Sequence, residues 1–121
     1  MFIDRSIGRF RFVLVLVWLT FSIGIALADV STFSLMNADT GQAIAGHDPL
    51  VDGASIDLDG LPTANLSIRA NVDAAVGSVV LELTGTEAHS QTENVAPYAL
   101  FGDSNGDYSP WQPTPGNYRL E

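Results

Sequence analysis

The segment with the clearest capacity for chemistry is a short acidic loop in the last fifth of the chain. Asp103, Asn105 and Asp107 occupy alternate positions there. Calcium loops place oxygen ligands at alternate positions in this way, so the three residues are a candidate calcium site. An EF-hand loop would also need a central glycine and a bidentate acid, but this sequence has Tyr108 and Thr114 at those positions. The sequence therefore excludes an EF-hand and leaves a looser calcium site.

Two interpretations of this loop remain open. In one, Glu93 or Asp73 approaches the loop in the folded protein and completes a calcium site. In the other, the loop is a hairpin turn whose Asp and Asn side chains bond their own backbone and whose Gly106 takes a positive φ. The second interpretation needs no metal.

Three aromatic residues lie near the acidic loop in the sequence, namely Tyr98, Tyr108 and Trp111. Aromatic faces beside carboxylates suit the recognition of sugars, so these residues are candidate ligand-binding positions. The alternative is that they pack in the core or at its rim, as aromatic residues near a proline-rich loop usually do. The first interpretation predicts a calcium-dependent carbohydrate-binding module.

A second acidic stretch runs from Asp48 to Asp59. On a strand, Asp57 and Asp59 would share one face, where they either ligate a cation or form a solvated surface. His47 and His89 are the only histidines, and no metal-site spacing joins them, so both are expected to be surface or loop residues.

The sequence offers little for catalysis, and we expect no enzyme. Serine, histidine and aspartate are all present, but no Gly-x-Ser-x-Gly turn or other nucleophile context occurs. The chain has no cysteine, which excludes thiol catalysis, cysteine zinc sites and disulfides.

Short apolar runs separated by Gly, Asn, Asp and Pro predict the elements that must position these residues. This pattern is typical of an all-β sandwich of antiparallel sheets. The clearest alternation has Leu66, Ile68 and Ala70 on one face. Pro97 should move its run to a sheet edge or make its start irregular. We expect six strands, at 30–36, 54–59, 66–71, 79–83, 95–101 and 117–121.

Residues 1–28 have the features of a secretory signal peptide. Three arginines precede an apolar stretch, and Ala26-Leu27-Ala28 is a small-x-small cleavage site before Asp29. The alternative is an uncleaved anchor, which would be the only contact with a membrane. Either way, we expect residues 29–121 to be a single domain that is secreted or held at the cell surface.

The charge of that domain limits its partners. The whole chain has a formal net charge of −9, and without residues 1–28 the balance is 2 arginines minus 13 acids, or −11. There is no lysine. Because nucleic-acid binders neutralise phosphates with Lys and Arg, nucleic acid is not an expected partner.

Several further motifs are spread over residues 30–121. They are Leu61-Pro62-Thr63, the run 65–71, Val76-Gly77-Ser78-Val79, the run 92–100, Gly102-Asp103, Gly106-Asp107-Tyr108, and Gly116 with Tyr118 and Leu120. Together these motifs resemble the immunoglobulin-like domains of large secreted bacterial surface proteins. Such domains often stand beside malectin-like or other carbohydrate-binding modules, so the resemblance implies a non-catalytic spacer or interaction role. Its implied partners are neighbouring extracellular domains or surface polysaccharide.

The predicted sandwich is short of strands. Six runs are fewer than the seven strands of the usual immunoglobulin-type domain, and the last run continues to the final residue. We therefore expect a domain truncated before its last strand, either because the chain is a fragment of a longer protein or because a partner supplies that strand.

Overall fold

The structure is a computed structural model that describes residues 11–14 and 30–121. Within these residues the chain forms two four-stranded sheets, a two-stranded hairpin and one short 3₁₀ helix. The predicted all-β class is therefore confirmed. The predicted signal peptide reaches the described residues only at Arg11–Leu14 and otherwise lies outside them. None of the described residues belongs to a helix long and apolar enough to cross a bilayer.

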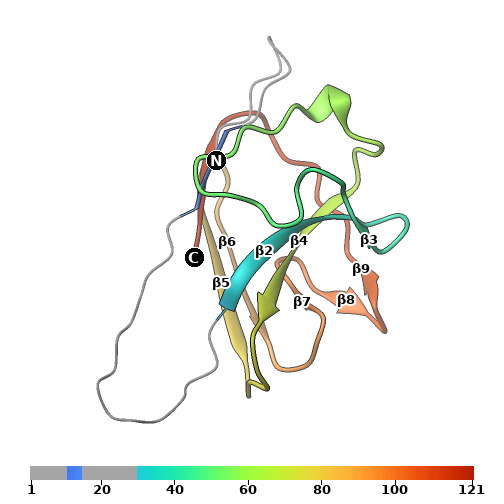
Figure 1. The fold of residues 1–121 in the computed structure, drawn as a ribbon, viewed down its shortest axis with the longest axis vertical. Coiled ribbons are helices and arrows are strands. Elements are labelled where there is room, and N and C mark those ends of the chain that lie inside the picture. The colour runs from blue at the N-terminus through green and yellow to red at the C-terminus, as the bar shows by residue number, and fades with distance from the viewer. Residues whose placement is uncertain (1–10, 15–29) are drawn as a thin grey trace.

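The first sheet has the order β3-β2-β4-β7, and all its pairs are antiparallel (Figure 1). The long central pair of β2 and β4 confirms two of the predicted strands. The bounds are β2 Val30–Asn37, β3 Gln42–Ala43, β4 Leu66–Val72 and β7 Tyr98–Ala99.

The second sheet has the order β1-β10-β5-β6. Here β10 pairs antiparallel with β5, and β5 with β6, whereas β1 pairs parallel with β10. The bounds are β1 Arg11–Leu14, β5 Val79–Gly85, β6 His89–Glu93 and β10 Asn117–Leu120.

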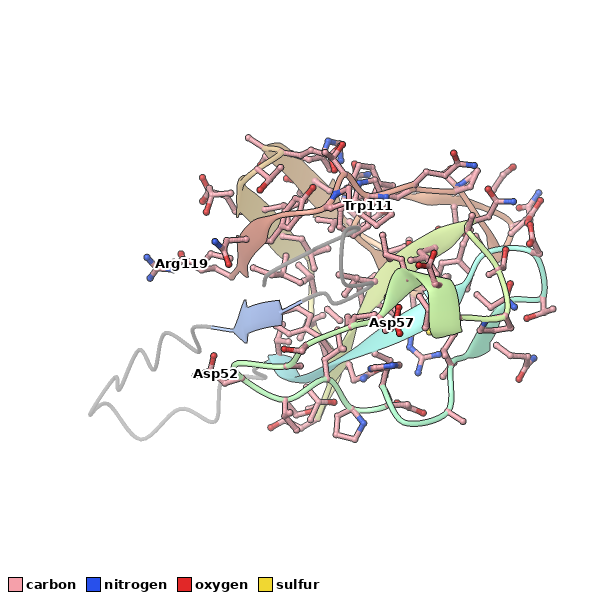
Figure 2. All side chains as sticks on the ribbon, turned by 90° about the horizontal axis from the view of Figure 1, so that it is seen from above. Asp52, Asp57, Trp111 and Arg119 are labelled. Atoms are coloured by element: carbon pink, nitrogen blue, oxygen red, sulfur yellow. The ribbon has the colours of Figure 1, made fainter. Side chains whose placement is uncertain are left out.

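One apolar core lies between the two sheets, which form separate layers in Figure 2. Strand β5 shows how the sequence produces it: Val79, Leu81 and Leu83 are buried, while Val80 and Glu82 are exposed. A strand with this alternation covers one face of a core and presents the other to water. The buried members of the core are Phe33, Leu35, Ile44, Leu50, Ile56, Leu66, Ile68, Ala70, Val79, Leu81, Leu83, Leu100, Trp111, Tyr118 and Leu120.

Strands β5 and β10 approach each other closely at Gly85. Its φ is +114°, and a Cβ at this position would lie 2.3 Å from the carbonyl oxygen of Asn117. Only glycine meets both conditions without strain, so this residue determines how the end of β5 fits against β10.

The predicted strand over 54–59 is wrong. Leu58–Gly60 forms the 3₁₀ helix η1, and the side chain of Asp57 accepts a hydrogen bond from the Asp59 backbone N–H at 3.0 Å. This local bond offers the backbone an alternative to a ladder, while Ile56 still becomes fully buried. The alternation of 54–59 therefore reflects a loop that inserts an apolar side chain into the core.

The predicted strand over 95–101 is shorter than expected, because only Tyr98–Ala99 is paired, as β7. This strand is at the edge of its sheet, as Pro97 indicates. Strand β6, by contrast, was not predicted: His89–Glu93 contains no apolar residue, but it pairs with β5 over five residues.

Candidate functional site

The acidic loop folds as a tight hairpin between β8 (Asp103–Ser104) and β9 (Asp107–Tyr108). Asn105 and Gly106 both take positive φ, at 52° and 87°. A two-residue connection of this kind matches the twist of its flanking strands. The Asp103 side chain accepts a hydrogen bond from the Gly106 backbone N–H at 2.7 Å. The hairpin interpretation of the loop is therefore confirmed.

The calcium interpretation would require further ligands, and the structure brings one acid near the loop. A Cβ on Gly102 would lie 3.4 Å from Oε1 of Glu93, whose carboxylate also accepts a hydrogen bond from Gln91 at 3.1 Å. However, no group of three His, Cys, Asp or Glu side chains suited to a metal ion occurs in 11–14 and 30–121. Asp103, Asn105 and Asp107 thus lie together in a turn, without an assembled cage around them.

The three candidate ligand-binding aromatics are directed inward. Trp111 is 5% exposed and lies in the core between the sheets, and the half-buried Tyr98 packs against that core. Tyr108 is 6% exposed and belongs to a second, small cluster with Met36, Ala38 and Ala99. A sugar-binding platform needs open ring faces, so the structure favours the core-packing interpretation of Tyr108 and Trp111.

Four aromatic rings form a continuous series of contacts, two of them stacked and one edge-on. His89 stacks on Phe101 with ring centroids 4.3 Å apart, and Phe101 stacks on Trp111 at 5.2 Å. Trp111 then meets the edge of Tyr118 at 5.7 Å. Among the described residues the Trp111 indole N–H has no hydrogen-bond acceptor. These ring contacts connect β6, the loop after β7, the segment before β10 and β10 itself.

The Tyr118 hydroxyl lies at a junction of loop and strand. It is within hydrogen-bond distance of the Thr114 carbonyl oxygen, at 2.7 Å, and also bonds the Glu87 carboxylate. The same Glu87 oxygen accepts from the Thr114 backbone N–H at 2.9 Å. Burial, and then the bond to Glu87, raise the pKa of Tyr118 above its ordinary value of 10.0. The phenol therefore stays protonated and acts as a donor that fixes the loop before β10.

Two acids of the 48–59 stretch, Asp48 and Asp57, form hydrogen bonds within the fold. Asp48 accepts a hydrogen bond from the buried Ser34 hydroxyl, which in turn accepts from Asn71 at 2.8 Å. Asp57 caps η1. Figure 2 shows Asp52 and Asp57 at separate places along this segment. The predicted pairing of Asp57 and Asp59 on one strand face does not occur, because the segment is not a strand.

Among the described residues, a pocket of about 270 Å³ opens beside β3. Its lining includes Asn37, Gln42 and His47, with Leu61 and Pro62 from the loop after η1. Burial lowers the pKa of His47, so the imidazole there is neutral near pH 7. The side-chain Oδ1 of Asn37 accepts hydrogen bonds from the backbone N–H groups of Asp39 and Thr40 in the following turn. A neutral polar lining of this kind suits a small uncharged group.

No family model, curated protein sequence or solved structure matches this chain.

Proposed function

We propose that residues 30–121 form an immunoglobulin-like β-sandwich module. Support comes first from strand order. In an immunoglobulin-type domain one sheet contains strands A, B and E in sequence, and the other contains C beside F. The order β2-β4-β7 fits A-B-E, and the pair of β5 with β10 fits C with F. The strands assigned to A, B, C, E and F follow one another in that order along the chain. The chain also passes to the second sheet after B, returns to the first sheet at E and passes to the second sheet again at F.

The single observation that carries this proposal is the hydroxyl of Tyr118. Sandwiches of this type have a tyrosine near the start of strand F whose hydroxyl bonds the backbone a few residues upstream. Tyr118 is the second residue of β10, and its hydroxyl bonds the carbonyl of Thr114, four residues earlier. The Pro115-Gly116 turn between them returns the chain toward the strand.

The proposed role is that of a non-catalytic spacer or interaction domain of a secreted or surface-exposed protein. The candidate site side chains have structural roles: Asp103 closes a turn, Tyr108 and Trp111 pack in apolar clusters, and Asp57 caps η1. A formal charge of −11 over 29–121 keeps such a module soluble and discourages binding to phosphate backbones.

Export and calcium independence are tested together. The full chain is expressed in a bacterial host with a periplasm, and the mass of the exported product is measured. The expected product begins at Asp29. Retention of the uncleaved chain in the cytoplasm would contradict export.

The exported product is then melted with excess calcium and with chelator, in parallel with an Asp103→Ala/Asp107→Ala variant. Because a ligand that binds only the folded state raises its stability, a spacer should melt at the same temperature in both buffers. An upward shift with calcium that the double variant loses would instead support the calcium-dependent carbohydrate-binding module. An Asp52→Ala/Glu82→Ala variant, at two exposed acids outside the candidate site, controls for the general loss of negative charge.

A further inference from the structure

The outer edge of β10 carries an interaction that the proposed role does not explain. Strands β1 and β10 pair in parallel, with Phe12 opposite Tyr118 and Leu14 opposite Leu120. All other strand pairs among the described residues are antiparallel. A parallel strand at the edge of an antiparallel sheet comes from a distant segment, because a short hairpin cannot produce it.

The backbone of β10 shows which of its groups face that edge. The Asn117 carbonyl accepts from Thr86, and Glu121 exchanges both backbone bonds with Glu82, so these residues turn their polar groups toward the β5 side. Successive residues of a strand direct these groups to opposite edges. Those of Tyr118 and Leu120 therefore point to the outer edge.

With β1 in place, these two residues are shielded from water. Tyr118 is 2% exposed and Leu120 is 0% exposed. Buried backbone groups need partners, and each one left unpaired costs free energy comparable to a lost hydrogen bond. The register of β1 places it where those partners are required.

We propose that the outer edge of β10 is a strand-acceptor site, and that Arg11–Leu14 of the chain itself occupies it by parallel β-augmentation. The partner that fits the edge is thus an extended peptide strand with apolar residues at alternate positions. Positive charge on the strand is favoured, because Arg11 belongs to the occupying segment and residues 29–121 are strongly acidic.

The site also has a mode of release, and this part rests on the proposed export. Cleavage after Ala28 would remove β1 and leave the groups of Tyr118 and Leu120 open to a second strand. Strand pairing at this edge and its release can be tested separately. The mass of the exported product shows whether β1 has been cleaved off, whereas the experiments below measure only whether a strand pairs with β10.

The first experiment uses a disulfide in the full chain, which has no natural cysteine. Val13 and Arg119 are register partners, and the Arg119 side chain is about half exposed and extends outward in Figure 2. Neighbouring strands lie about 4.8 Å apart, within the roughly 4.4 to 6.8 Å that a disulfide requires between Cα atoms. A Val13→Cys/Arg119→Cys variant should form an intramolecular disulfide under mild oxidation.

The matched control pairs Val13→Cys with Val80→Cys, because Val80 is exposed on β5, a strand that does not pair with β1. We expect the Arg119 pair to crosslink roughly tenfold faster than the control, as intramolecular proximity dictates. Equal rates for the two variants would overturn the proposal, whatever the second experiment gives.

The second experiment tests the edge in trans. Phe12→Pro/Val13→Pro in the full chain should weaken β1, because every second residue of a strand donates to its neighbour and proline cannot donate. Amide exchange of Tyr118 and Leu120 should then lose roughly tenfold protection or more. A Gly24→Pro/Ile25→Pro variant, with both prolines outside β1, is the control.

A synthetic peptide covering Arg9 to Val15 should restore that protection. The same peptide N-methylated at Phe12 and Val13 has the same charge and side chains but lacks the backbone N–H donors of these two residues, so it should not restore the protection. Equal rescue by both peptides would mean that charge or apolar contact drives the effect, and no rescue by either would mean that the edge accepts no strand. Either result contradicts the proposal.

Discussion

Replacing Tyr118 by phenylalanine removes one hydroxyl and leaves the ring in the core. The hydroxyl bonds the Thr114 carbonyl and the Glu87 carboxylate. Hydrogen bonds to charged groups contribute about 1.5 to 3 kcal/mol, so we expect the free energy of unfolding to fall by about 2 kcal/mol. Since 1 kcal/mol corresponds to about 4 to 8 °C for a domain of this size, the melting temperature should fall by roughly 8 to 16 °C.

The assay is thermal unfolding followed by circular dichroism at pH 7, with Tyr108→Phe as the matched control. Tyr108 is as buried as a core residue, but its hydroxyl makes no hydrogen bond to another described residue. Its loss should change stability by less than about 0.5 kcal/mol. If Tyr118→Phe is no more destabilising than Tyr108→Phe, the junction of Glu87, Thr114 and Tyr118 does not hold the fold, and the immunoglobulin-like assignment loses its main support.

The same pair of proteins tests the raised pKa of Tyr118. A group whose pKa is higher in the folded state contributes stability that is complete below its ordinary pKa of 10.0 and is lost as the pH rises above it. The stability gap between the wild type and Tyr118→Phe should therefore be constant up to about pH 10 and then narrow. A gap that widens above pH 10 would mean that the sign of the shift is wrong.

Three further predictions use single substitutions and chemical or thermal unfolding. Gly85→Ala should lower the free energy of unfolding by about 2 to 4 kcal/mol, because a positive φ and a contact with backbone act together at this position. Gly53 has a positive φ but open space around it, so Gly53→Ala should lower the free energy of unfolding by only about 1 kcal/mol. Equal losses would refute the close approach of β5 and β10 at Gly85. Leu81→Ala should lower the free energy of unfolding by about 2 to 5 kcal/mol and Val80→Ala by less than about 0.5 kcal/mol, because only the Leu81 side chain is buried. Similar losses would mean that the face of β5 assigned to the core is wrong. Asp103→Ala should lower the free energy of unfolding by about 0.5 to 1.5 kcal/mol, with or without calcium, because it removes the hydrogen bond from the Gly106 N–H. A loss of stability seen only with calcium would contradict the turn interpretation.

Strands with an apolar residue at every second position could be predicted from the sequence. The runs that became β5 and β10 bury one face and expose the other, and the run that became β4 alternates apolar and polar residues, so period-two alternation identifies them. Strand β2 alternates only in part, because both of its faces are buried from Phe33 to Met36. Strand β6 could not be found in this way. Its residues are polar throughout, and pairing with β5 rather than burial makes it a strand.

The candidate site was harder to predict, because the sequence gives residue types and not directions. Alternate acids at 103–107 fit both a calcium loop and a turn, and the decisive bond from Gly106 to Asp103 is a property of the backbone conformation. Trp111 follows a proline and precedes another close by, which suggests a loop, yet its ring enters the core. The sequence analysis does not predict the role of Tyr118, although it contains a signal: Pro115-Gly116 comes directly before a strand whose second residue is this tyrosine.

The ring stack described above also makes the domain report optically on its own folding. The chain has two tryptophans, Trp18 and Trp111, and only the second belongs to the proposed exported domain. Its indole is 5% exposed and lies between Phe101 and Tyr118. Emission from the folded domain should therefore be blue-shifted, and light absorbed by Tyr118 should be transferred efficiently to this one acceptor. Unfolding would shift the emission to the red and uncouple the pair, so unfolding of the proposed exported domain can be followed without an added label.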